Sequence, residues 1–233
     1  MTDLARRRRL RSATAVAAAL ALGATGCIRG SLPAREYYRL SIPDSVVGPS
    51  LPASPGGGAA AVALPVGTLA VAPYVTPGIY ADASIAYRIG ETEYGAYPSR
   101  EWALPLGQML GVLTEGVLNR SPLTRSSAIF NPPSLRSHTY VWRGTVREFE
   151  EVDRGRTVSA AVRIDAALVR MADDSVIWTG SARREAPVTN GASMDAVVRA
   201  LSALAVETVG SLVAEADAAM RRSPPAASAR GRD

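Results

Sequence analysis

Three consecutive segments in the second half of the chain alternate apolar and polar residues, and this period of two constrains the fold more than any other feature. Apolar side chains occupy every second position from Val158 to Leu168, and mostly polar ones lie between them. The same period occurs in the two flanking segments, 139–149 and 176–182. Polar turns at 153–156 and 172–175 separate the three segments. Phe149 falls out of phase, which indicates a bulge or a strand end. The pattern predicts an antiparallel meander with one buried and one wet face.

Two segments carry apolar residues at helical spacing instead. The first spans Ser99 to about Arg120, with Ser99 as its cap, although Pro105 indicates a later start. The second spans 190–220, and either Asn190 or Ser193 can cap it. Each has a continuous apolar stripe of the kind that packs against a sheet.

Three shorter strands are predicted before the first helix, at residues 36–42, 68–72 and 84–89. The order of elements is then three strands, a helix, three strands and a helix. This order predicts a single α+β domain with a mainly antiparallel sheet and two amphipathic helices packed on one face.

The ends of the chain and one internal stretch differ in composition from the rest. Residues 44–65 are rich in Pro, Gly and Ala and predict a flexible linker. Residues 221–233 predict a disordered, charged tail. The predicted organisation is a signal peptide at 1–26, a lipidated N-terminus with the first strand and the linker at 27–66, the remainder of the domain at 67–220, and the tail at 221–233.

The first 27 residues have the anatomy of an export signal. A basic start, Arg6–Arg11, precedes an apolar run, Ala13–Ala24, that is shorter than the ~20 residues of a membrane-spanning helix. The run leads into Ala24-Thr25-Gly26-Cys27, which resembles a bacterial lipobox. We expect Cys27 to carry a diacylglyceryl group and to become the new N-terminus, and several acyl chains give a stable membrane anchor. Ile28 favours the outer membrane, facing the periplasm, over the inner membrane. The alternative is a plain signal peptide followed by an unmodified thiol.

Composition excludes several functional classes. Residues 27–220 hold 17 basic and 19 acidic residues, so the body lacks the excess positive charge that a nucleic-acid-binding protein needs. All the basic residues are Arg, and the absence of Lys excludes P-loop, kinase and Schiff-base chemistry. One His and one Cys exclude Cys/His metal clusters and disulfides. We expect no cofactor, no metal and no enzymatic activity.

Two polar groups have residue types that occur in catalytic sites. His138 has Ser134 and Ser137 nearby but no nucleophile-elbow motif, so a solvated or capping role is the better interpretation. Four acidic residues cluster at the end of the first meander strand: Glu148, Glu150, Glu151 and Asp153. Paired carboxylates can hydrolyse glycosides, but the arginines around these four favour a charged hairpin tip.

Five of the eight tyrosines fall between residues 74 and 97, among Gly and Pro. Tyr74 and Tyr87 are expected to pack on the sheet. Tyr80, Tyr94 and Tyr97 are candidates for a subunit or partner contact, because tyrosine combines a large apolar area with a polar tip. Simple packing is the alternative for these three as well.

Several short segments follow Cys27 in a characteristic order: Tyr37-Tyr38-Arg39-Leu40, Leu69-Ala70-Val71-Ala72-Pro73, Ile85-Ala86-Tyr87-Arg88, Glu101-Trp102-Ala103-Leu104-Pro105-Leu106 and Val146-Arg147-Glu148-Phe149-Glu150. In this order the chain resembles the ABC-type transport auxiliary lipoproteins, which include the paraquat-inducible protein C-like, MCE-associated proteins. The resemblance implies a non-enzymatic periplasmic lipoprotein that works with an MCE-domain protein and ABC transporter components in lipid transport, and it makes homo-oligomerisation plausible. The alternatives are an envelope scaffold or activator of a cell-wall synthase, and a secreted hydrolase that uses His138.

Overall fold

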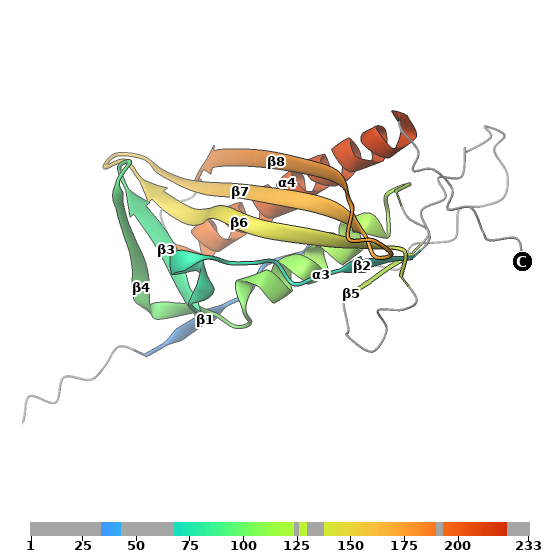
Figure 1. The fold of residues 1–233 in the computed structure, drawn as a ribbon. Helices are drawn as coiled ribbons and strands as arrows, with labels where there is room; N and C mark the ends of the chain where they lie inside the picture. Colours follow the sequence, from blue (N-terminus) through green and yellow to red (C-terminus); the bar gives the residue numbers. More distant parts are fainter. Residues whose placement is uncertain (1–33, 43–67, 124–125, 130–137, 190–192, 223–233) are drawn as a thin grey trace, which may run out of the picture. The chain divides into compact units, whose positions relative to one another are not determined.

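The computed structural model describes residues 34–42, 68–123, 126–129, 138–189 and 193–222 (Figure 1). The chain divides into two compact units, Met1–Ala34 and Arg35–Asp233, and every described helix and strand belongs to the second. Cys27 and the predicted linker at 44–65 lie outside the described residues. Of the predicted tail, only Arg221 and Arg222 are described, and they end a helix.

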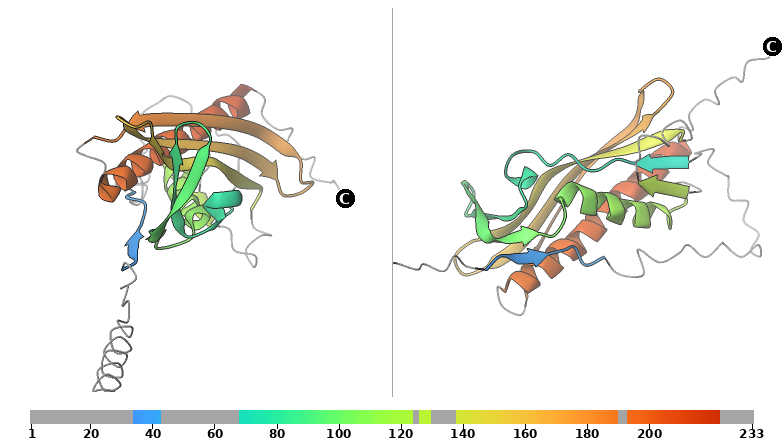
Figure 2. Two further views of the ribbon diagram at one scale, coloured as in Figure 1. Left: turned by 90° about the vertical axis from the view of Figure 1, so that its left-hand side faces the viewer. Right: turned by 90° about the horizontal axis from the view of Figure 1, so that it is seen from below.

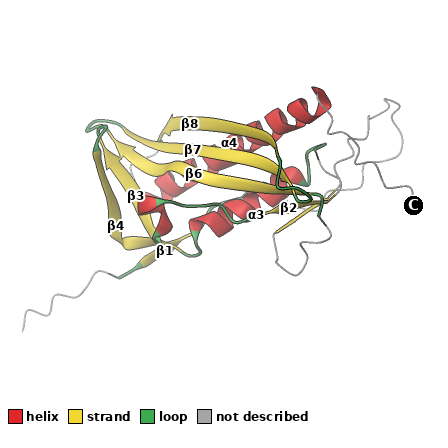
Figure 3. Ribbon diagram, in the orientation of Figure 1, coloured by secondary structure: helices red, strands yellow, loops and turns green. Residues whose placement is uncertain are grey.

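The predicted meander is confirmed. It consists of β6 (Tyr140–Asp153), β7 (Val158–Arg170) and β8 (Val176–Pro187), paired antiparallel in this order (Figure 3). In the β6–β7 turn, the backbone N–H of Gly155 donates to Asp153 Oδ1 at 2.7 Å, and Gly155 adopts a φ of 81° that glycine tolerates without strain. In the β7–β8 turn, the Ser175 N–H donates to Asp173 Oδ1 at 3.1 Å. In both turns an aspartate side chain accepts a hydrogen bond from a backbone N–H at the point where the chain reverses.

The break in alternation at Phe149 is a bulge. The register between β6 and β7 shifts between Val146 and Glu148, so that Val146 and Phe149 can both face the core. The strand continues beyond the bulge to Asp153, four residues further than predicted.

Two strands share the other edge of β6. Both β2 (Thr68–Val71) and β3 (Ser84–Ile89) pair parallel to β6, one along its first half and the other along its second. The chain between them stays on this edge, and the Val75 N–H donates to the Gly144 carbonyl at 2.9 Å. The sheet therefore divides into two branches beyond β6.

The two branches hold the remaining strands. In the first, β4 (Glu93–Trp102) pairs antiparallel with β3, and β1 (Glu36–Tyr38) pairs parallel with β4. In the second, β5 (Ser126–Ile129) pairs parallel with β2. The longest pairings are antiparallel, as predicted, but the eight-stranded sheet is mixed.

The predicted start of the first helix is wrong. Helix α3 spans Leu106–Leu118, and Pro105 is its N-cap. Ser99 and Glu101 lie in β4 instead, where Glu101 pairs with Arg35 at 3.1 Å. Proline has no N–H and disfavours a helical conformation in the residue before it, so the helix starts after Pro105.

Helix α3 and helix α4 (Met194–Arg222) cover the same face of the sheet, so the prediction of a one-sided α+β domain is confirmed (Figure 2). Ser193 caps α4, accepting a hydrogen bond from the Ala196 N–H at 3.3 Å. The core between helices and sheet is apolar, and its largest fully buried side chains include Trp142, Phe149, Leu110 and Leu201. By length and composition α4 could cross a membrane, but its apolar stripe is part of this core.

Tyr74 joins α3 to the sheet. Its hydroxyl lies 2.7 Å from Thr114 Oγ1 and accepts a hydrogen bond from Trp142 Nε1 at 3.1 Å. Two glycines make room for it: a Cβ at Gly144 would lie 2.2 Å from the ring, and one at Gly107 would lie 2.2 Å from the Tyr74 carbonyl oxygen. Burial raises the pKa of Tyr74 to about 12, so the hydroxyl stays protonated.

Candidate docking surfaces

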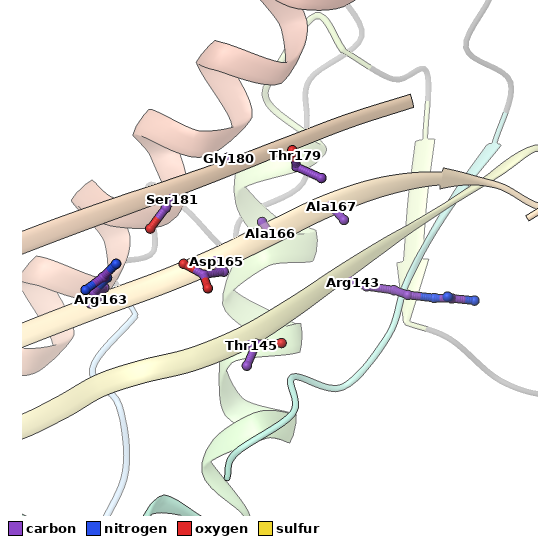
Figure 4. Close-up of a pocket in the computed structure, with 9 residues that line it drawn as sticks. All are labelled: Arg143, Thr145, Arg163, Asp165, Ala166, Ala167, Thr179, Gly180 and Ser181. Atoms are coloured by element: carbon purple, nitrogen blue, oxygen red, sulfur yellow. The ribbon is translucent and has the colours of Figure 1, made fainter. Parts of the chain in front are cut away.

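The face of the β6–β7–β8 sheet opposite the helices carries a shallow depression of about 590 Å³ (Figure 4). Alternation along the strands places polar side chains on this side because the other side forms the core. The floor is built of small residues, including Ala167 and Gly180. The polar residues that line it are Arg143, Thr145, Arg163, Asp165, Thr179 and Ser181. We call this surface the open face.

Ion pairs order part of the open face. Arg147 Nε lies 2.6 Å from Asp165 Oδ2, although the two side chains are 52% and 34% exposed. Partial burial raises the pKa of Asp165, but hydrogen bonds from Ser181 and Arg147 outweigh this, so the net shift of the pKa is downward. Asp165 is therefore a fixed negative charge at the centre of the depression.

A second set of ion pairs lies toward the β6–β7 turn. Arg183 pairs with Glu148 at 2.9 Å and with Glu185 at 2.8 Å. Arg154 also pairs with Glu185, and this contact lowers the pKa of the Glu185 carboxyl. Each of these carboxylates is held by at least one guanidinium.

The acidic cluster at the end of β6 is not the solvated hairpin tip that its sequence suggested. Glu150 is 0% exposed, and its carboxylate accepts hydrogen bonds from Arg88 Nε at 2.7 Å and from the Tyr80 hydroxyl. The hydrogen bond to Glu150 raises the pKa of Arg88, so the guanidinium remains charged. A carboxylate is tolerated inside the protein here because a cation and a hydroxyl satisfy it.

Glu151, the next residue, has a different set of partners. It is buried, and its carboxylate accepts a hydrogen bond from the Tyr97 hydroxyl at 3.0 Å. Burial raises the pKa of Glu151, against the opposing effect of this hydrogen bond. Burial and the nearby carboxylate also raise the pKa of Tyr97 to about 12. The guanidinium of Arg100 lies 4.8 Å from the centre of the Tyr97 ring.

The three tyrosines proposed as contact residues lie in different environments. Tyr80 is 9% exposed and bonded to Glu150, Tyr97 is half-buried, and Tyr94 is 52% exposed beside Arg88. A partner or subunit contact through them stays a prediction, and only Tyr94 offers much of its ring to such a contact. Tyr74 packs in the core, as expected.

The remaining predicted site residues are only partly described. Cys27, Ser134 and Ser137 lie outside the described residues. His138 is half-buried just before β6. No sequence motif marks the open face as a site, although the alternation around Arg163 and Asp165 places both residues on the wet side of the sheet.

Comparison with known proteins finds no family model and no curated protein that matches this chain. Among solved structures, the chain is similar to a Xanthomonas campestris protein described under the family DUF330, with 21% identity over 67% of this chain and 88% of that one and a TM-score of 0.58. An uncharacterised protein matches with 16% identity over 78% of this chain and 98% of that one, also with a TM-score of 0.58.

A PelC dodecamer from Paraburkholderia phytofirmans matches with 13% identity over 65% of this chain and 88% of that one. Its TM-score of 0.44 is too low to bear on the assembly of this chain. The two higher-scoring likenesses show that the domain has the fold of the DUF330 protein, which is consistent with the resemblance to the auxiliary lipoproteins.

Proposed function

We propose that the mature protein is a membrane-anchored periplasmic accessory lipoprotein of an ABC/MCE-type system that transports lipid between membranes. In this proposal the chain carries out no chemical step. Acyl chains on Cys27 hold it at the outer membrane, and the α+β body acts as a docking or assembly module for an MCE-domain protein and ABC transporter components.

The observation that carries the proposal is the export signal ending in Ala24-Thr25-Gly26-Cys27. Lipidation at this cysteine would explain why the only thiol of the chain lies three residues after the end of the apolar run. The fold shared with the DUF330 protein supports the body's part in the proposal, as does the ordered set of segments shared with the auxiliary lipoproteins.

The geometry of the first strand is compatible with a short tether. Nine Cα–Cα steps separate Cys27 from Glu36, the first residue of β1, and an extended chain spans at most about 30 Å over that length. The β1 edge of the body would therefore lie within about 30 Å of the membrane that holds Cys27.

The first test is the state of the mature N-terminus. Mass spectrometry of protein purified from membranes should find Cys27 as the first residue, with acyl chains attached. A Cys27→Ser variant should lose the acyl mass and leave the outer-membrane fraction, whereas the matched Ser31→Ala variant should behave as wild type. An unmodified thiol in fully processed wild-type protein would contradict the proposal.

The second test concerns the partners. The detergent-solubilised protein should co-purify with an MCE-domain protein and an ABC permease, and analytical ultracentrifugation should show whether it forms homo-oligomers. Co-purification with a cell-wall synthase instead would support the envelope-scaffold alternative. Retention of full function in cells by a His138→Ala variant would exclude the hydrolase alternative.

A further inference from the structure

We propose that the open face of the β6–β7–β8 sheet binds an acidic, carboxylate-rich segment of a partner protein, with Arg143 and Arg163 as its two main contacts. This inference rests on the proposed function, because it identifies which surface of the docking module meets a partner and what chemistry that partner presents.

The first observation is a pair of like charges. Arg163 on β7 lies directly opposite Arg183 on β8, so both side chains leave the sheet on the open face. Like charges in this position repel each other and destabilise a sheet. Glu148 on β6 lies opposite Arg163 on the other side, yet it pairs with Arg183. Within the described part of the chain, no acidic group lies within ion-pair distance of Arg163.

The second observation is the weak pairing of Arg143. Its ion pair is with Asp174 at 3.7 Å, and the two side chains are 56% and 81% exposed. Pairs this exposed contribute little to stability, so this contact leaves Arg143 available to a ligand. Arg143 and Arg163 lie at opposite ends of the depression, with the hydroxyl groups of Thr145 and Ser181 between them (Figure 4).

The register sets the spacing that a ligand has to match. Arg143 lies opposite Ala167, and Arg163 is four residues before Ala167 on β7. At about 3.4 Å per residue, the two arginines are about 14 Å apart along the strand direction. Two carboxylates four residues apart on an extended segment match this distance, and each can accept two parallel hydrogen bonds from a guanidinium.

The acidic residues of the open face favour a protein segment over a membrane surface. Asp165, Glu148 and Glu185 lie among the arginines, and each is held in an ion pair. A uniform layer of phosphates would meet these carboxylates as well as the guanidinium groups, and like charges across an interface are costly. A folded or extended protein segment can place its carboxylates over Arg143 and Arg163 alone.

The test measures binding of a fluorescein-labelled hexaglutamate peptide to the full mature protein in detergent, by fluorescence anisotropy at low ionic strength. The test variant is Arg143→Gln/Arg163→Gln. The matched control is Arg156→Gln/Arg199→Gln, which removes two exposed arginines from the β6–β7 turn and from α4. Both variants lower the net charge by the same amount, so a difference between them reports on the open face.

We expect the test variant to bind the peptide about five- to tenfold more weakly than wild type, as the loss of two exposed charge contacts implies. The control should stay within about twofold of wild type, and both variants should keep the wild-type circular dichroism spectrum. Added salt should weaken binding of the wild type more than that of the test variant, because fewer charge contacts remain to be screened.

Four results would overturn the proposal. They are an absence of peptide binding by the wild type, an equal loss in both variants, competition by phosphatidylglycerol vesicles with the same dependence on the two arginines, and a change in the protein's own oligomeric mass in the test variant. The last two would assign the surface to the membrane or to a second copy of the chain. None of these measurements depends on acylation of Cys27 or on which transporter co-purifies, so failure here is distinguishable from failure of the proposed function.

Discussion

Replacing Arg88 with methionine should destabilise the protein far more than replacing an exposed arginine, because it leaves a carboxylate buried without its cation. The Glu150 side chain is 0% exposed and that of Arg88 is 10% exposed, with 2.7 Å between Arg88 Nε and Glu150 Oε1. Removing one partner of a buried ion pair costs about 3–5 kcal/mol. For a domain of this size, about 2–4 °C of melting temperature is lost per kcal/mol, so the expected decrease is about 6–20 °C.

Urea unfolding followed by circular dichroism gives the free energies that test this estimate. The matched control is Arg147→Met, which breaks an ion pair of similar length whose side chains are 52% and 34% exposed, and it should cost less than about 1 kcal/mol. Adding Glu150→Gln to Arg88→Met removes the stranded charge and keeps an acceptor for the Tyr80 hydroxyl, so the double variant should recover most of the loss. If Arg88→Met lowers the free energy of unfolding no more than Arg147→Met does, the Glu150 carboxylate is not shielded from water and the reasoning is wrong.

Three further predictions concern packing and pH. The folded protein holds the Glu151 proton more tightly than the unfolded chain does, because the pKa of Glu151 is raised in the fold. The contribution of this group to the free energy of unfolding should therefore fall as the pH rises above the ordinary carboxyl pKa of 4.5. Urea unfolding at several pH values between 4 and 7 should show this fall in the wild type and not in Glu151→Gln. Gly107→Ala should lower the melting temperature, because its Cβ would lie 2.2 Å from the Tyr74 carbonyl oxygen. The control is Gly210→Ala, whose Cβ would meet no atom within 4 Å and which should gain about 0.5–1 kcal/mol from helix propensity. Equal effects of the two substitutions would contradict the close approach at Gly107. Tyr74→Phe should cost about 1–3 kcal/mol in urea unfolding by leaving the Trp142 indole N–H without its acceptor, and an unchanged midpoint would show that another group replaces it.

The meander could be predicted from the sequence because its pairings are local. Each strand from β6 to β8 pairs with its neighbour in sequence through a short turn, and one covered face gives each strand a visible period of two. The aspartates of the turns, Asp153 and Asp173, mark where the chain reverses. Local pattern and tertiary structure agree in this half of the chain.

The first half was harder because its pairings are distant in sequence. Strand β4 pairs with β1 across more than sixty residues, and β5 is a short strand that pairs with β2. Trp102 is buried at the end of β4, but its spacing to Leu106 also fits a helix. The apolar pattern therefore predicts one long helix from Ser99, although Pro105 indicates the later start that the structure has.

The candidate sites show the same division. The sequence predicts that the acidic run at the end of β6 is solvated, because four acids near a turn usually face water. Arg88 and Tyr97, which lie more than fifty residues earlier in the sequence, bury two of those acids. The positions of Arg143 and Arg163 on the wet face follow from alternation alone. Among the described residues Arg163 forms no ion pair although Glu148 lies opposite it, because Glu148 pairs with Arg183 on the far side of β7.

The pairing of β1 has a mechanical consequence if the membrane holds Cys27. A pull on the tether would act first on β1. This strand is held by its pairing with β4 at Glu36–Tyr38, by the ion pairs of Arg35 with Glu101 and of Glu36 with Arg100, and by the hydrogen bond from the Ser41 N–H to Ser202 Oγ. The pairings that join β6, β7 and β8 are much longer, so β1 would separate from β4 before the meander came apart. Separation of this edge strand would add its residues to the tether and lengthen it while the meander stayed folded.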